Sequence, residues 1–119
     1  MPSIETLGVQ VGATVTAVGI GAAIADTGAL TAGDYRVIAN LGSDGVGAAG
    51  KAIVLEHRDS TNATTIRTLA RCPFGVAQHL RIDRVTIATN ERIRAIGGSV
   101  AGGAGENSTA YIEVIAVPV

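Results

Sequence analysis

The sequence is poor in aromatic residues, and this shortage limits how a core can be built. Only 3% of its 119 residues are aromatic, and there is no tryptophan. Valine, isoleucine, leucine and alanine must therefore fill the core, and alanine buries little apolar surface per residue. Sixteen glycines add backbone entropy that folding has to overcome. We expect a thin core whose burial is completed between subunits, so the composition favours an oligomer.

Cysteine, lysine and long apolar runs are also scarce. The single cysteine, Cys72, excludes a disulfide framework within the chain, and we expect it to be a small buried hydrophobic residue. No segment approaches the roughly 18 consecutive apolar residues of a membrane span. The N-terminus lacks the basic region and apolar run of a signal peptide. We therefore expect a chain made in the cytoplasm, with no membrane partner.

Charge is nearly balanced overall, at −1, but arginine is concentrated in one segment. Residues 67–94 contain six arginines and two acidic residues, a local charge of +4. Nucleic-acid-binding proteins usually have a larger basic excess and aromatic stacking platforms, so we expect no nucleic-acid partner. Arginine forks suit fixed pairing with carboxylates. The segment could therefore dock an acidic partner surface; the alternative is solvated strand faces with local ion pairs.

Apolar residues alternate with polar ones along most of the chain, which is the pattern of β-strands. The expected strands are residues 5–17, 18–25, 35–41, 51–58, 64–72, 80–88, 92–96 and 109–119. Gly8 or Gly12 should bend the first of them. The alternation shifts by one residue near Asp83 and Arg84, which predicts a bulge there. Residues 59–62 read as the turn of a hairpin, and residues 74–80 could hold one helical turn.

These strands predict an all-β fold. Seven to nine short strands separated by turn signals are typical of an antiparallel β-sandwich of jelly-roll or immunoglobulin-like type. A chain of this length is most simply one domain. We expect residues 13–119 to form the sandwich. Residues 1–12 would be its first strand or an extended arm that lies on a neighbouring molecule.

The last strand is apolar on both faces, with Glu113 as the one interruption. Ala110, Ile112 and Val114 alternate with Tyr111 and Ile115 along this segment. A strand of this kind belongs in the middle of a sandwich, or on a surface covered by another copy of the chain.

No catalytic, cofactor or metal site emerges from the motifs. Residues 45–51 match a glycine-rich phosphate loop, but a strand follows where a helix is needed, and Ala52 replaces the Ser or Thr that would hold magnesium. Residues 97–101 lack the last glycine of a nucleophile elbow. His57 and His79 fit no metal-ligand spacing and are expected at a surface or interface. We expect no enzyme activity, cofactor or metal.

In layout the sequence resembles the small capsid decoration, or cement, proteins of tailed bacteriophages, or related small β-sandwich virion proteins. The resemblance lies in residues 30–37 (LTAGDYRV), 90–96 (NERIRAI) and 109–114 (TAYIEV), joined by Gly/Ala loops. It implies a homotrimer that is made in the host cytoplasm, binds the major capsid protein on the capsid surface, and stabilises the assembled shell.

Within that resemblance, we expect Tyr111, Ile115 and Val117 to form the contact between subunits, and Arg92 and Arg94 to dock on the partner. An alternative function is a carbohydrate- or receptor-binding β-sandwich module of a phage fibre or tail. Scarce aromatics count against it, because sugars are usually stacked on Trp or Tyr. An enzyme subunit that uses the glycine loop is a second alternative.

Overall fold

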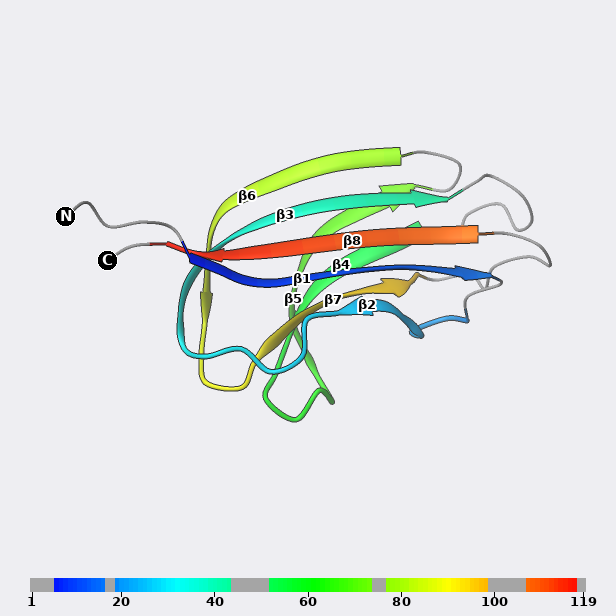
Figure 1. Cartoon of the computed structure of the whole chain (residues 1–119). Coiled ribbons are helices and arrows are strands. Elements are labelled where there is room, and N and C mark those ends of the chain that lie inside the picture. Colours follow the sequence, from blue (N-terminus) through cyan, green and yellow to red (C-terminus); the bar gives the residue numbers. More distant parts are fainter. Residues whose placement is uncertain (1–5, 17–18, 44–51, 74–76, 99–106, 118–119) are drawn as a thin grey trace.

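The computed structural model describes residues 6–16, 19–43, 52–73, 77–98 and 107–117 of the chain. Eight β-strands and no helix occur within these residues, so none of them forms a helix that could span a bilayer. The strands are β1 (Thr6–Thr16), β2 (Ala23–Asp26), β3 (Gly33–Ser43), β4 (Ala52–Arg58), β5 (Thr65–Pro73), β6 (Ala77–Ile87), β7 (Arg92–Gly97) and β8 (Asn107–Ala116). They form two layers that lie face to face (Figure 1). The expected all-β antiparallel sandwich is confirmed.

The two sheets have four strands each and a nested order. Sheet A runs β1-β8-β3-β6 and sheet B runs β2-β7-β4-β5. The antiparallel pairs β1·β8, β2·β7, β3·β6 and β4·β5 alternate between the sheets, as in one long hairpin rolled over on itself. A jelly roll has eight strands in two sheets, whereas immunoglobulin-like sandwiches have seven or nine. The order therefore favours the jelly-roll alternative.

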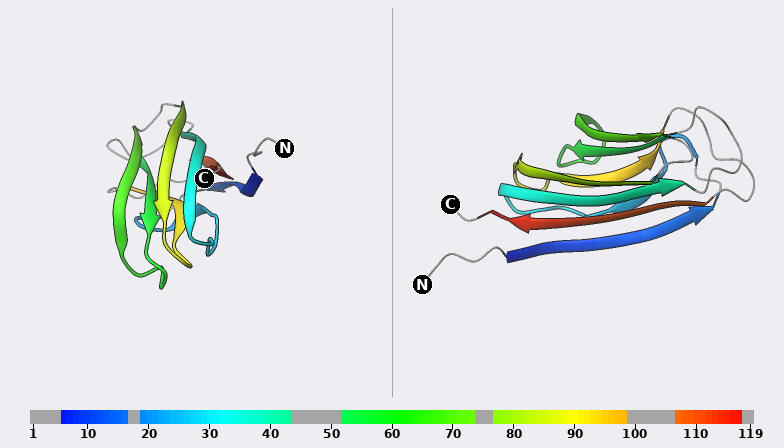
Figure 2. Two further views of the ribbon diagram at one scale, coloured as in Figure 1. Left: turned by 90° about the vertical axis from the view of Figure 1, so that its left-hand side faces the viewer. Right: turned by 90° about the horizontal axis from the view of Figure 1, so that it is seen from above.

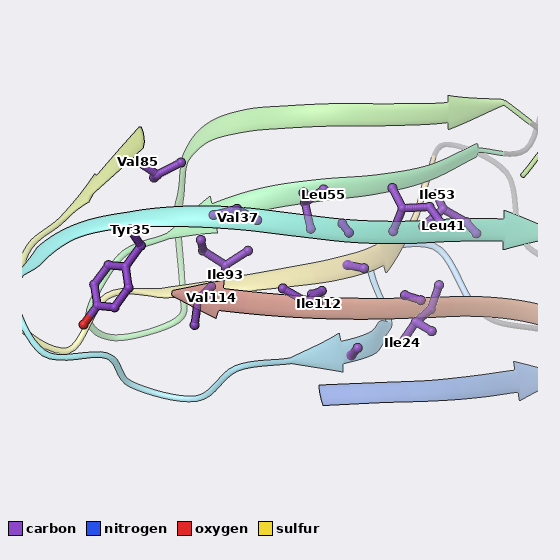
Figure 3. Close-up of a cluster of buried hydrophobic side chains, with 14 of the residues drawn as sticks. Ile24, Tyr35, Val37, Leu41, Ile53, Leu55, Val85, Ile93, Ile112 and Val114 are labelled. Carbon is purple, nitrogen blue, oxygen red and sulfur yellow. The ribbon is translucent and has the colours of Figure 1, made fainter. Parts of the chain in front are cut away.

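The core lies between the sheets and is almost entirely aliphatic (Figure 3). Its largest fully buried side chains are Leu41, Ile53, Leu55, Ile87, Ile93, Ile112, Val37, Val85 and Val114. Tyr35 is the one aromatic ring of the core among the described residues, and its hydroxyl donates to the carbonyl of Thr31 at 2.9 Å. Cys72 is buried, as expected.

Two bulges keep the apolar side chains of sheet A turned inward. Tyr35 pairs with Val85 while Val37 pairs with Ile82, so β6 carries an extra residue at the predicted position, Asp83 and Arg84. In β1 the register shifts at Gly8, one of the two glycines expected to bend this strand. An extra residue in one strand moves its side-chain alternation back into phase with the core.

The predicted hairpin of β4 and β5 is confirmed, and its turn is held by Asp59. The Asp59 carboxylate accepts the backbone N–H groups of Ala63 and Thr64 at 2.9 and 3.2 Å. These hydrogen bonds, and the one from Ala63 most strongly, lower the pKa of Asp59 below its ordinary value. Asn62 adopts φ 58°, a left-handed conformation that asparagine tolerates better than most residues.

Three boundaries differ from the sequence expectation or extend beyond the described residues. β2 is only four residues long, because Gly21 with φ 74° forms a turn where residues 18–25 were expected to be extended. β6 begins at Ala77, so the helical turn expected over residues 74–80 is wrong for its last four residues; residues 74–76 lie outside the described residues. Thr6–Thr16 form strand β1, and residues 1–5 of the predicted arm lie outside the described residues.

Candidate functional site

The outer face of sheet A carries the three residues predicted to contact another subunit. β8 lies between β1 and β3, so its backbone is paired on both sides. Its alternate side chains Ala110, Ile112 and Val114 are completely buried in the core. Tyr111, Ile115 and Val117 are only half-buried, because they point away from the core. We call these three residues the outer stripe.

Within the outer stripe, the side chain of Tyr111 is fixed by a hydrogen bond to Glu113. The Tyr111 hydroxyl donates to Glu113 Oε2 at 2.9 Å, and Gln10 Nε2 on β1 donates to the same oxygen at 3.4 Å. The hydrogen bond to this carboxylate raises the pKa of Tyr111. Gly12 of β1 leaves room for the ring, since a Cβ there would lie 3.2 Å from Tyr111 Cδ2. The stripe is therefore an ordered, largely apolar surface suited to packing rather than to chemistry.

The predicted docking arginines lie on the outer face of sheet B, where acidic residues of the same chain pair with them. Arg94 Nε lies 2.6 Å from Glu56 Oε1, and Arg92 Nη1 lies 3.4 Å from Asp26 Oδ2. The cross-strand register places Asp26, Arg94 and Glu56 in one row over β2, β7 and β4. Glu56 is only 3% exposed. A docking role for the two arginines stays a prediction, and their contacts here are structural.

A test of this network is to replace Arg94 by methionine. The Glu56 carboxylate would remain buried without its closest partner, so the variant should lose about 3 kcal/mol of unfolding free energy in urea titrations. The double variant Glu56→Gln/Arg94→Met should recover much of that loss. Arg81→Met serves as the matched control, since Arg81 and Asp83 form an exposed pair that contributes about 0.5 kcal/mol or less. An equal loss in both single variants would contradict the assigned role of Glu56.

A cavity of about 410 Å³ lies between β5 and β6 and is bordered by a buried histidine. Its lining includes His57, Ile66, Ile87, Ala88 and Glu91. The expectation of a surface or interface histidine is wrong for His57, which is 3% exposed within the chain. Its Nε2 atom lies 2.9 Å from Glu91 Oε1, while Nδ1 is buried without a partner. The pair ties the end of β4 to the turn between β6 and β7.

The acid limb of the stability profile should depend on Glu91. Hydrogen bonds from the Ala88 N–H and from His57 lower the pKa of Glu91 below its ordinary value of 4.5. A carboxyl group with a lowered pKa stabilises the folded state above about pH 4.5, and this contribution is lost as the pH falls through the lowered value. Glu91→Gln should therefore be less stable than wild type at pH 7 and lose less on acidification to pH 3. Asp83→Asn is the control, because Asp83 is highly exposed; urea unfolding at both pH values measures the difference.

The other candidate sites of the sequence do not gather into a reactive centre. Within the described ranges, no three His, Cys, Asp or Glu residues lie close enough to hold a metal ion. His79 contacts Asn40 on the outer face of sheet A, beside a second cavity of about 400 Å³. The glycine loop at residues 45–50 lies outside the described residues, and the strand β4 begins directly after it at Ala52.

Comparison with known proteins gives few matches. No protein-family model matches the sequence, and no curated protein is similar to it. Among the solved structures that align with the chain, two are each described as a pentameric capsid protein isolated from metagenomic phage sequences. The first is 20% identical with a TM-score of 0.47, over 91% of this chain and 61% of that chain. The second is 22% identical with a TM-score of 0.46, over 91% and 64%. The chain thus spans less than two thirds of either structure.

Proposed function

We propose that this chain is a non-enzymatic virion structural protein that attaches to the outside of an assembled phage capsid and stabilises it. In this proposal it acts as a homotrimer, and its partner is the major capsid protein. The observation that carries the proposal is the outer stripe of β8. Among the described residues, no second layer covers this face, although it carries Tyr111, Ile115 and Val117, with Glu113 as the one interruption between them.

Burial of the outer stripe supports self-association energetically. Fully burying a large apolar side chain contributes about 1.5–3 kcal/mol, so a side chain that the chain itself already covers in large part can contribute at most about 1 kcal/mol more. Three such side chains on each of three subunits would together contribute part of the free energy of association of a trimer. The surroundings of Ile115 are not purely apolar, because the register of β3 and β8 places Arg36 directly opposite it. A subunit contact here would have to accommodate that guanidinium group together with the apolar side chains.

Two of the three segments that carry the resemblance to decoration proteins meet at one end of the sandwich. Leu30 N–H donates to the carbonyl of Glu91 at 2.9 Å, and Asn90 N–H donates to the carbonyl of Leu30 at 2.8 Å. Residues 30–37 and 90–96 are thus joined by backbone hydrogen bonds. Residues 109–114 belong to strand β8. We infer a jelly roll from the nested pairing of the strands.

The stabilising mechanism would be mass action. A protein that binds the assembled shell and not its separated subunits lowers the free energy of the shell by the free energy of binding. Many copies around one shell multiply that effect. Neither a covalent step nor a bound cofactor is required.

The direct test is co-sedimentation of the purified protein with capsids that lack it. We expect the protein to pellet with assembled, expanded shells and to raise their melting temperature. The matched control is the same protein mixed with unassembled major capsid protein, where we expect no complex. Failure to pellet with any shell would overturn the proposal. Binding to a glycan array without binding to shells would instead support the carbohydrate- or receptor-binding alternative.

A further inference from the structure

The four edge strands of the sandwich differ in how well they are protected against pairing with another strand. An unprotected edge strand is a template for another chain, and natural proteins protect edges with charges, proline or very short strands. β2 has only four residues. β5 carries exposed Arg67 and Arg71 and ends at Pro73. β6 carries exposed arginine and aspartate side chains along its length. Three of the four edges are therefore protected.

β1 lacks this protection. It is eleven residues long, contains no charged residue and no proline, and is paired only with β8 among the described strands of its sheet. Figure 2 shows it at the rim of the sandwich, with β8 on one side. After the bulge at Gly8, residues 9–16 pair with β8 without interruption. A regular row of backbone hydrogen-bonding groups therefore lies along the open side of β1.

The side chains of β1 also leave apolar surface uncovered. Val9, Val11 and Val15 pack against the core but are only partly buried, and Ala13 on the same side is exposed. Core-facing residues at the rim of a sheet are covered when the sheet is continued by another strand. Both the backbone edge and the partly exposed valines of β1 therefore indicate that another strand pairs with β1.

We propose that β1 pairs antiparallel with β1 of a second copy of this chain across a two-fold axis, so that sheet A continues from one copy into the next. Self-pairing fits the chemistry of this strand, because an uncharged strand opposed by itself places no like charges together. The valines of β1 all have odd numbers. Any register that places odd-numbered residues of the two copies opposite each other therefore puts the valines of both strands on the same side of the continued sheet. A two-fold contact is also the commonest symmetry of soluble oligomers.

This contact is distinct from the outer stripe, and one chain can make both. The stripe lies on the outer face of β8, whereas the β1 contact uses the backbone edge of the neighbouring strand. A two-fold contact between trimers produces assemblies larger than a trimer. The inference requires only purified chain, so its outcome is independent of the proposed role on a capsid.

The test combines hydrogen exchange with one pair of variants. In wild type, the β1 amides that point away from β8 should exchange at least about tenfold more slowly in concentrated than in dilute solution. Ala13→Lys places a charge on the core-facing rim of β1; Ala13 is exposed in the single chain, so the fold should tolerate it. It should remove this protection and lower the mass by light scattering at least about twofold.

Gln78→Lys is the control, since Gln78 is exposed and core-facing on β6, the opposite edge of sheet A. It should keep the wild-type mass and exchange pattern. Two results would overturn the proposal. One is fast exchange of the outward β1 amides in wild type at every concentration. The other is an unchanged mass and protection in Ala13→Lys.

Discussion

Replacing Leu55 by alanine should lower the free energy of unfolding by about 3 kcal/mol. Leu55 lies on β4 between the two sheets and is completely buried. The loss combines the transfer free energy of the missing carbon atoms with the cavity left behind, because the aliphatic core relaxes only in part. A domain of this size has a total stability of about 5–15 kcal/mol, so the loss is a large share of it.

The matched control for Leu55→Ala is Ile66→Ala. Ile66 lies on the neighbouring strand β5 and is 46% exposed, so its replacement should cost about 1 kcal/mol or less. Urea unfolding at one fixed protein concentration measures both values, which keeps the contribution of self-association constant. Equal losses in the two variants would mean that the space between the sheets is not the core.

Replacing Ile115 by aspartate should abolish the trimer and leave at most dimers held through β1. The new carboxylate would have to be desolvated at the subunit contact, and three like charges would gather around one axis. Together these effects should weaken the trimer by roughly 100-fold or more. Light scattering measures the mass, and circular dichroism should be unchanged, because Ile115 lies outside the core cluster.

Ile66→Asp is the control for Ile115→Asp. It introduces the same charge at an exposed isoleucine of sheet B, away from the outer stripe. This variant should keep the wild-type mass. A trimer that persists in Ile115→Asp, or is lost equally in Ile66→Asp, would contradict the placement of the subunit contact.

Local alternation was sufficient to predict most of the strands and one detail of their pairing. Residues 35–41 alternate without interruption, and they form the central part of β3. The bulge at Asp83 and Arg84 was predictable because a shift in a two-residue period leaves a visible break in the sequence. The strand expected over residues 18–25 was too long, since the alanines and glycines there satisfy a strand pattern and a turn equally well.

Contacts between distant segments could not be predicted in the same way. The partners of Arg94 and Arg92 depend on the register of β2, β7 and β4, which is fixed by the topology of sheet B. His57 was expected at a surface or interface, because its spacing from other candidate ligands fits no metal site. In the fold it faces the turn that carries Glu91. The sequence did indicate that β8 is apolar on both faces, but only the fold identifies which face is left open.

The light-scattering mass of the purified wild-type protein over a range of concentrations tests the central claim most directly. Because β8 and β1 leave apolar surface uncovered in the single chain, we expect the chains to associate. The measured mass should be a multiple of three chains at micromolar concentration and should fall on dilution. A single-chain mass at every concentration, together with undiminished stability, would contradict the account.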